Sequence, residues 1–303
     1  MKSVLLVNLG TPAAPTAAAV RTYLAEFLSD PRVVPLPRPI WLPLLHGVVL
    51  PLRARQSAHK YAQIWMPEGS PLAVYTARMA ALLAERLERP VRYAMRYGEP
   101  AIATALSGLP DPVVVPLYPQ YANSTTASVL DVLPRGIPVV RGFHDHPAYI
   151  AALAASVRRH WDERGRALML VISFHGLPQR AAGGYERECR TSAALLARAL
   201  GLRDAEWRVT FQSRFGYARW LEPYTEQTLI ELARDGLRRL DVICPGFVAD
   251  CLETLEEIGI RARQRFEDAG GESLELVPCL NDSPEWIAAL AALVTEPSAR
   301  AAP

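Results

Sequence analysis

The feature that most constrains this chain is a repeated alternation of short apolar runs with amphipathic stretches. Eight runs rich in Val, Ile and Leu recur along 303 residues, and each precedes a stretch with helical periodicity. This order is typical of parallel strands joined by helices. The predicted strands are Ser3–Leu9, Val91–Met95, Pro112–Leu117 and Pro138–Gly142 in the first half, and Leu168–Phe174, Arg208–Gln212, Asp241–Cys244 and Leu274–Val277 in the second.

The two halves also begin alike. Residues 5–12 read LLVNLGTP and residues 170–178 read LVISFHGLP, the same pattern with His175 as an additional residue. A chain of this length is expected to form more than one core. We therefore predict an α/β protein of two similar Rossmann-like lobes, 1–146 and 147–297, followed by a disordered tail at 298–303. Each lobe holds a four-stranded parallel sheet flanked by helices, and ligands bind at the carboxyl ends of the strands, in a cleft between the lobes.

Composition narrows the class of partner. The apolar fraction is 50%, the charged fraction is 21%, and the net charge of +2 comes with dispersed arginines. These values are typical of a globular protein that binds a small molecule rather than nucleic acid. The first residues lack the features of a secretory signal, which predicts a cytoplasmic protein. Four cysteines without a C-x-x-C pair indicate neither a zinc site nor a disulfide framework.

The segment Pro31–Leu52 breaks the alternation. It is apolar and contains six prolines, so we expect it to be unsuited to a long helix. Its uninterrupted apolar stretch is shorter than the ~20 residues that a spanning helix needs. Two interpretations remain open. The segment is either a buried connection or an apolar lip at the mouth of a cleft, flanked by Arg53, Arg55 and Lys60, whose residues 40–52 could touch a membrane.

His175 is the first candidate for chemistry. It stands where a predicted strand ends and where Gly176 and Pro178 turn the chain. An imidazole at such a point can bind protons or a metal ion. The alternative is a histidine that only hydrogen-bonds a loop carbonyl, and position alone does not decide between the two.

Glu253 is the second candidate. With Asp250 it has the spacing of a capping box, in which Asp250 is the N-cap and Glu253 the N3 residue. That structural role is the alternative to a functional one. Glu256 and Glu257 add carboxylates on neighbouring turns, which form either a solvated face or a path of oxygen ligands for a divalent cation.

Two large aromatic residues, Trp220 and Phe247, lie in loops that follow predicted strands. They could form walls for a flat ligand, or they could pack on the core. Gly10 lacks the full G-x-G-x-x-G pattern, so no dinucleotide site is predicted.

Together these segments resemble the ferrochelatase family over nearly the whole chain. Each motif is weak alone, but seven occur in the family's order. They are Val7–Pro12 (VNLGTP), Gly69–Leu72 (GSPL), Met95–Gly98 (MRYG), Tyr118–Tyr121 (YPQY), Ser173–Pro178 (SFHGLP), Trp220–Pro223 (WLEP) and Phe247–Leu255 (FVADCLETL).

The resemblance implies the roles of individual residues. The family's invariant histidine falls on His175 and its glutamate on Glu253, which makes both catalytic residues and metal ligands on opposite sides of the macrocycle. Asp250 and Glu257 would form a secondary acidic path. The resemblance further implies substrate contacts at Leu9, Tyr97, Trp220 and Phe247, and propionate contacts at Ser70 and at Arg53, with Arg55 as an equal alternative.

Three departures from the family pattern are informative. Leu9 stands where the coproporphyrin-using branch has a tyrosine, which favours protoporphyrin as the substrate. Cys251 stands where animal relatives have a histidine, so a third ligand there is in doubt. Asn123 and a tail without cysteine replace the cysteines that hold an iron–sulfur cluster in some members, so we expect neither a cluster nor another tightly bound cofactor.

The expected function is therefore insertion of ferrous iron into protoporphyrin IX, a lyase reaction of haem biosynthesis. The alternatives are a coproporphyrin or sirohydrochlorin chelatase and a non-catalytic tetrapyrrole carrier. The expected partners are porphyrin and ferrous iron, without nucleic acid, in a cytoplasmic protein that could be peripheral to the inner membrane.

Overall fold

A computed structural model describes residues 2–216 and 218–295. The described residues form two compact units, 2–142 with 290–295, and Phe143–Ala289. The predicted lobe boundary between residues 146 and 147 stays a prediction. The predicted tail, 298–303, lies outside the described residues.

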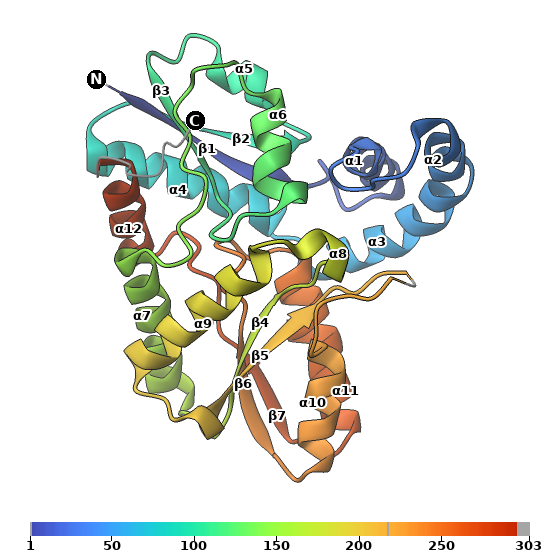
Figure 1. The fold of residues 1–303 in the computed structure, drawn as a ribbon, viewed down its shortest axis with the longest axis vertical. Coiled ribbons are helices and arrows are strands. Elements are labelled where there is room, and N and C mark those ends of the chain that lie inside the picture. The colour runs from blue at the N-terminus through green and yellow to red at the C-terminus, as the bar shows by residue number, and fades with distance from the viewer. Residues whose placement is uncertain (1, 217, 296–303) are drawn as a thin grey trace. The chain divides into compact units, whose positions relative to one another are not determined.

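The first unit contains a parallel sheet with the order β2-β1-β3 (Figure 1). Its central strand β1 (Ser3–Gly10) is paired with β2 (Val91–Tyr97) and with β3 (Pro112–Pro116). α4 (Pro71–Leu87) lies on one face, and α5 (Ile102–Leu106), the π-helical turn η2 (Asn123–Ala127) and α6 (Ser128–Val132) follow the later strands. Leu5 and Val7 of β1 are fully buried in the cluster that α5 and α6 complete. Val4 and Leu6, which point to the other face of the strand, are also buried, so both faces of this run are apolar.

The fourth predicted strand of this unit, Pro138–Gly142, is not a strand. Val139 forms a single parallel bridge with Val114, in which Val114 N donates to Pro138 O and Val140 N donates to Val114 O. The next hydrogen bond in each direction would need an N–H from Pro116 or from Pro138, and proline has none. The first sheet therefore has three strands, and our expectation of four was wrong.

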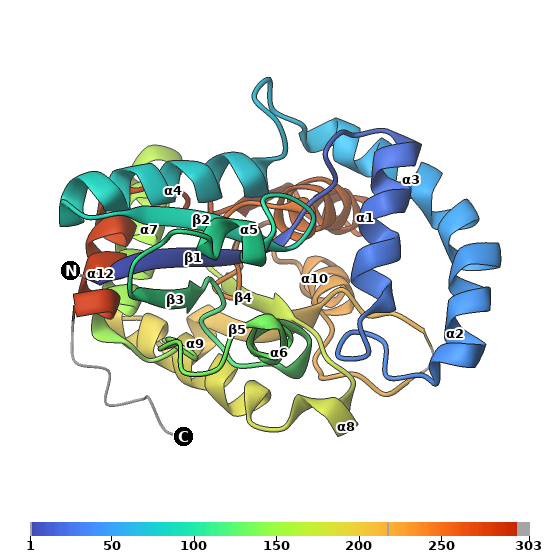
Figure 2. The same ribbon diagram turned by 90° about the horizontal axis from the view of Figure 1, so that it is seen from above.

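Our expectation that Pro31–Leu52 avoids a long helix was also wrong. α2 (Arg38–Leu44), the π-helical turn η1 (Leu45–Val49) and α3 (Leu50–Ile64) follow one another without a break, as one curved path in Figure 2. Pro39 stands in the first turn, where no N–H is required. Farther along, the wider π turn replaces the regular pairing, and Leu50 N donates to Leu45 O. α1 (Ala17–Ser29) packs against this path.

The same segment is not simply a buried connection. Large apolar side chains are exposed at every fourth position, with exposed fractions from 44% to 68%. Positions four apart share one face of a helix, and all of these residues except Leu36 lie on the helical path that begins at Arg38. We call these residues the lip stripe: Leu36, Ile40, Leu44, Val48 and Leu52.

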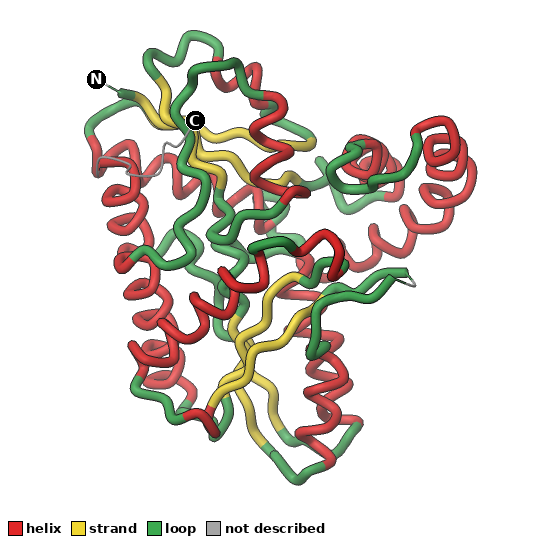
Figure 3. The backbone as a smooth tube through the Cα atoms, in the orientation of Figure 1, coloured by secondary structure: helices red, strands yellow, loops and turns green. Residues whose placement is uncertain are grey.

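The second unit holds a parallel sheet with the order β5-β4-β6-β7, and all four strands agree with the predicted runs to within a few residues. Figure 3 shows these strands in yellow between red helices. The strands are β4 (Leu170–His175), β5 (Trp207–Gln212), β6 (Arg239–Ile243) and β7 (Ser273–Leu276). The helices are α7 (Pro147–Arg164), α8 (Gln179–Ala182), α9 (Tyr185–Leu200), the short 3₁₀ turn η3 (Asp204–Glu206), α10 (Thr225–Arg234), the π-helix η4 (Leu252–Ala262) and α11 (Arg263–Asp268), while α12 (Pro284–Thr295) ends in the first unit.

One apolar cluster holds this sheet to its helices. Val171 and Val242 from the two central strands pack with Leu229 of α10, Ile258 of η4 and Phe266 of α11, all nearly inaccessible to solvent. Burial of one such side chain contributes about 1.5–3 kcal/mol. The core therefore fixes the strand ends from which the candidate site is built. Among the described helices, none is long and apolar enough to cross a membrane.

Candidate active site

His175 is the last residue of β4, as its place before Gly176 predicted. Its Nδ1 lies 2.6 Å from the carbonyl oxygen of Gly176, which can only accept a hydrogen bond. Nδ1 must therefore carry the proton in the neutral ring, and Nε2 keeps a lone pair. The Tyr185 hydroxyl donates to the His175 carbonyl over 2.9 Å and holds the main chain at this point. The loop hydrogen bond is thus present, and it leaves the other ring nitrogen as a base.

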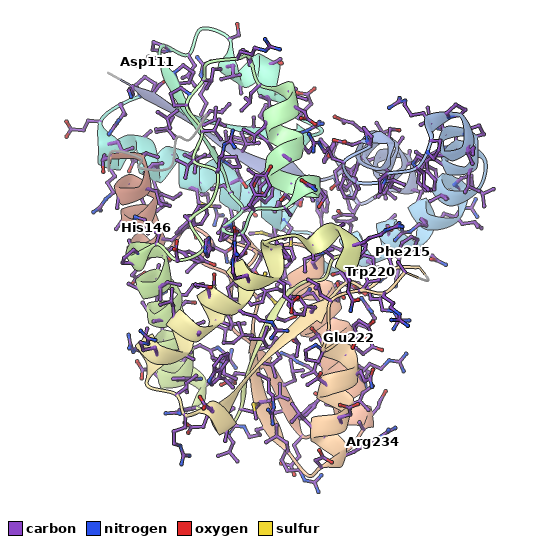
Figure 4. All side chains as sticks on the ribbon, viewed as in Figure 1. Asp111, His146, Phe215, Trp220, Glu222 and Arg234 are labelled. Atoms are coloured by element: carbon purple, nitrogen blue, oxygen red, sulfur yellow. The ribbon has the colours of Figure 1, made fainter. Side chains whose placement is uncertain are left out.

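The loop after His175 is paired with the loop that carries Trp220. Leu221 N donates to Leu177 O, and Gln179 N donates to Arg219 O, both over 2.9 Å. This pairing brings Trp220, labelled in Figure 4, against Gly176. A Cβ on Gly176 would lie 2.7 Å from the Gln212 carbonyl oxygen and 3.3 Å from a Trp220 ring carbon. Only glycine fits there.

Aromatic surface lies beside the imidazole. The Phe247 ring, in the loop after β6, has its centroid 6.3 Å from that of His175, at an interplanar angle of 57°. Trp220 is half-buried, and within the described residues its indole Nε1 is buried without a hydrogen-bond partner. The second unit thus places Phe247 beside the imidazole and Trp220 against the glycine that follows it. Whether these residues contact a substrate stays a prediction.

Glu253 lies in the first turn of η4, but it does not cap the helix. The N-cap is Cys251, whose N–H donates to Thr254 Oγ1 over 3.0 Å in a capping box one residue later than the predicted one. The Thr254 hydroxyl in turn donates to Asp250 Oδ1 over 3.0 Å. Our alternative interpretation, Asp250 as N-cap with Glu253 at N3, was therefore wrong. Thr254 is the N3 residue, and its hydroxyl accepts the hydrogen bond from the N-cap N–H.

The other carboxylates of this region have strong partners. Asp250, 5% exposed, accepts from Thr254 and from Asn281 Nδ2 over 2.7 Å. Glu257 accepts from Ser213 N over 2.8 Å and from Ser213 Oγ over 2.6 Å. Half-buried Glu253, by contrast, contacts the thiol of Cys251, whose pKa is raised by burial and then by this carboxylate.

The partners of these carboxylates also matter for the predicted acidic path. Arg261 lies 3.5 Å from Glu256 and 3.8 Å from Glu257. Within the described residues, no group of three or more His, Cys, Asp or Glu side chains is placed to hold a metal ion. The path through Asp250 and Glu257 stays a prediction, although both side chains are engaged inside the protein.

In the first unit, the predicted contacts lie at the ends of β1 and β2. Leu9 is half-buried, and its N–H is bonded to Asn8 Oδ1. The neighbouring Gly10 has a φ of +117°, and a Cβ there would overlap the Tyr97 carbonyl. Thr11 Oγ1 donates to Ser70 Oγ over 2.7 Å, although Ser70 itself is only 3% exposed. The fold thus gathers Leu9, Ser70 and Tyr97 into one region.

Tyr97 has an internal role that the sequence did not predict. It is 1% exposed, and its hydroxyl donates to Asp30 Oδ2 over 2.8 Å. Arg96 and Ser128 also donate to Asp30 Oδ2. Burial raises the pKa of Asp30, but hydrogen bonds from Ser128, Arg32 N–H and Tyr97, with the charge of Arg96, lower it below the usual value overall. As a substrate contact, Tyr97 stays a prediction.

The two candidate arginines differ in burial. Arg53 is half-buried on α3, and this burial lowers the pKa of its guanidinium, while Arg55 is exposed. Both remain candidates for propionate binding. An arginine side chain suits a carboxylate because it can form paired hydrogen bonds.

The fold is similar to that of a solved structure. The structure of SirB from Bacillus subtilis with Fe3+ covers 97% of this chain and 94% of its own, with a TM-score of 0.56 and 16% identity. At this identity the likeness shows the fold alone, which is an α/β fold with two parallel sheets.

The sequence then gives the family. The family model Ferrochelatase matches residues 1–298. A protein named ferrochelatase from Azoarcus sp. (strain BH72) is 56% identical over 308 residues, covering 95% of this chain and 85% of that protein. A second, from Polaromonas sp. (strain JS666), is 54% identical over 311 residues with the same coverage. The chain belongs to the ferrochelatase family, as the seven motifs predicted.

Proposed function

We propose that this protein inserts ferrous iron into protoporphyrin IX to form haem. The family membership supports this reaction, and the residues at the ends of β4 and β6 have the chemistry it needs. Each turnover releases two pyrrole protons and places one Fe2+ among four nitrogens. Iron is thus a substrate, and we propose that the protein has no tightly bound cofactor.

The observation that carries the proposal is the 2.6 Å separation between His175 Nδ1 and the Gly176 carbonyl oxygen. Because Nδ1 donates to the Gly176 carbonyl, Nε2 is the nitrogen that accepts a pyrrole proton. Imidazole is the side chain that most often accepts a proton as a general base in enzymes. The loop carbonyl also orients the ring, so no ordering is required at the moment of transfer.

Glu253 would serve the metal on the other side of the ring. Its neighbours Asp250 and Glu257 are held by Thr, Asn and Ser donors. Within the described part of the chain, the side chain of Glu253 is instead paired with the Cys251 thiol. Carboxylate oxygens bind divalent cations and can accept protons. We propose that Glu253 contacts iron directly and that Asp250 and Glu257 keep its helix in place.

The apolar side chains would shape the porphyrin. A flat macrocycle is a poor ligand because its nitrogen lone pairs lie in the ring plane. Rigid walls that favour a buckled ring would stabilise the insertion transition state more than the free substrate. We propose this role for Leu9, Trp220 and Phe247, with Ser70 and either Arg53 or Arg55 near the propionates.

The test uses two substitutions that keep the size of the side chain or reduce it. Purified His175→Ala and Glu253→Gln should lose iron insertion by about 10²-fold or more, since each removes a group that acts in proton or metal transfer. Porphyrin binding, measured by fluorescence, should survive in both variants. Exposed residues of the same types, His59→Ala and Glu163→Gln, are matched controls and should keep full turnover. Undiminished turnover in either active-site variant removes that residue from the mechanism.

The alternatives are separated by substrate. Protoporphyrin, coproporphyrin and sirohydrochlorin, each offered with Fe2+ under anaerobic conditions, should give the highest kcat/KM with protoporphyrin, in keeping with Leu9 and with relatives named ferrochelatase. A higher kcat/KM with sirohydrochlorin or coproporphyrin reassigns the substrate.

We also propose that the protein is cytoplasmic and that its lip stripe rests on the membrane surface. Four large apolar side chains on the helical path and Leu36 just before it, 44% to 68% exposed, accompany the exposed cationic residues Arg38 and Arg55. Apolar burial combined with attraction to anionic headgroups is the usual basis of interfacial binding.

The membrane contact is tested by cosedimentation with vesicles that contain phosphatidylglycerol. A double variant, Ile40→Ser with Leu52→Ser, should bind several-fold more weakly. Leu168→Ser is the matched control, because Leu168 is 79% exposed but lies in the other unit. Equal vesicle binding by the wild type, the double variant and Leu168→Ser would contradict the membrane contact.

A further inference from the structure

Gln212 connects the segments that carry His175 and Glu253. It is the last residue of β5, it is 3% exposed, and it is aligned with His175 in the register of the sheet. Its carbonyl oxygen accepts the N–H of Gly176 over 2.8 Å. The main chain of Gln212 therefore fixes the residue whose own carbonyl orients the imidazole.

The Gln212 side chain reaches the other candidate. Nε2 donates to the carbonyl oxygen of Glu253 over 2.7 Å. Oε1 accepts from Ser173 Oγ over 2.7 Å and from the Cys244 thiol over 3.4 Å. The Glu253 carbonyl determines the orientation of the amide, because a flipped amide would place Oε1 against that carbonyl oxygen, two acceptors without a hydrogen between them.

Ser213 extends this connection by one helical turn. Its N–H and hydroxyl both donate to the Glu257 carboxylate. It adopts a φ of +64°, a left-handed conformation that is unfavourable for a residue with a side chain. Such a conformation persists only where surrounding interactions determine it. Two consecutive residues thus hold two consecutive turns of η4.

We propose that Gln212 and Ser213 are positioning residues for iron insertion, which fix the Glu253 turn of η4 relative to the His175 loop. This inference rests on the proposed function. Neither residue needs to touch porphyrin or iron. Their effect follows from geometry, since a displacement of about 1 Å in a catalytic group can cost about 10²-fold in rate.

The main test is Gln212→Leu, which keeps the approximate volume and removes the amide. We expect kcat to fall by about tenfold or more while KM for porphyrin changes less than about threefold, because the walls of the site remain. The matched control is Thr225→Val. Thr225 is 1% exposed and belongs to the same buried network through Ser173 and Thr210, but among the residues that the structure describes no hydrogen bond joins it to η4 or Gly176.

Two readouts separate positioning from a general loss of stability. Amide hydrogen exchange in η4 should become about tenfold faster in Gln212→Leu and remain within about twofold of wild type in Thr225→Val. This measurement needs no turnover, so it stands even if the proposed reaction fails. In Gln212→Glu the new carboxyl can donate to the Glu253 carbonyl only when protonated, so its activity relative to wild type should rise as the pH falls.

The inference is overturned if Gln212→Leu retains wild-type kcat, or if Thr225→Val loses as much kcat and η4 protection as Gln212→Leu. If Gln212→Leu does not fold, Ser213→Ala, which deletes one hydrogen bond to Glu257, provides the same comparison with an expected loss of about threefold. Wild-type kcat in a folded Ser213→Ala protein, with unchanged exchange in η4, would then contradict the proposal.

Discussion

Gly176→Ala tests whether the close packing behind His175 matters. The added Cβ would lie 2.7 Å from the Gln212 carbonyl oxygen, 3.3 Å from Trp220 and 3.7 Å from Phe211. Carbon–oxygen contacts are comfortable at about 3.3 Å or more, so the loop must move by roughly 0.6 Å. That movement stretches the hydrogen bond from Gly176 N to Gln212 O.

The magnitude follows from two contributions. Overpacking a filled core costs about 1–3 kcal/mol, and the weakened hydrogen bond costs about 1 kcal/mol. We therefore expect the free energy of unfolding to fall by about 2–4 kcal/mol in urea titrations. Turnover should fall by about tenfold, because the carbonyl that orients His175 moves with the loop.

Gly47→Ala is the control for the substitution itself. A Cβ at Gly47 meets nothing within 4 Å, and the residue lies inside a helical segment. Alanine there should stabilise the protein by about 0.5–1 kcal/mol. Wild-type stability and turnover in Gly176→Ala would refute the packing argument.

Two further predictions concern titratable groups. Asp30→Asn should destabilise the protein by about 3 kcal/mol at pH 7, because it leaves the half-buried Arg96 without its carboxylate. Since the folded pKa of Asp30 is lowered, its contribution is present above the unfolded pKa and is lost as the pH falls through the folded value. The difference in urea midpoint between the two proteins should therefore shrink below about pH 4, and a difference independent of pH contradicts this. Burial raises the thiol pKa of Cys189, Cys244, Cys251 and Cys279, so iodoacetamide at pH 8 should alkylate them only after unfolding. Mass spectrometry that finds rapid alkylation of any of the four in the folded protein refutes that expectation.

The strands and the motif positions could be predicted from sequence because buried parallel strands are continuous apolar runs. All seven strands coincide with predicted runs, and His175 ends a strand as expected. The eighth run, Pro138–Gly142, does not form a strand, and the reason is visible only in how it is aligned with β3. Val139 is opposite Val114, and this pairing places Pro116 and Pro138 where donors are required.

The remaining errors also depend on geometry that the sequence does not express. Prolines in 31–52 argue against a helix, but π-helical widening at 45–49 absorbs the interruption. The capping box lies one residue later than predicted, because Glu253 and Thr254 are both residue types that suit the N3 position. Gln212 was missed, although a polar residue at the end of the buried run 207–212 could have drawn attention to it.

Multiple-turnover iron insertion is the most direct test of the central claim. The purified protein, mixed anaerobically with Fe2+ and a large excess of protoporphyrin IX, should convert many equivalents to haem. The free-base absorption bands should disappear with a rate proportional to protein concentration, and His175→Ala should abolish the change. Free-base bands that persist, or that shift by one equivalent only, would identify a tetrapyrrole carrier and contradict the proposed function.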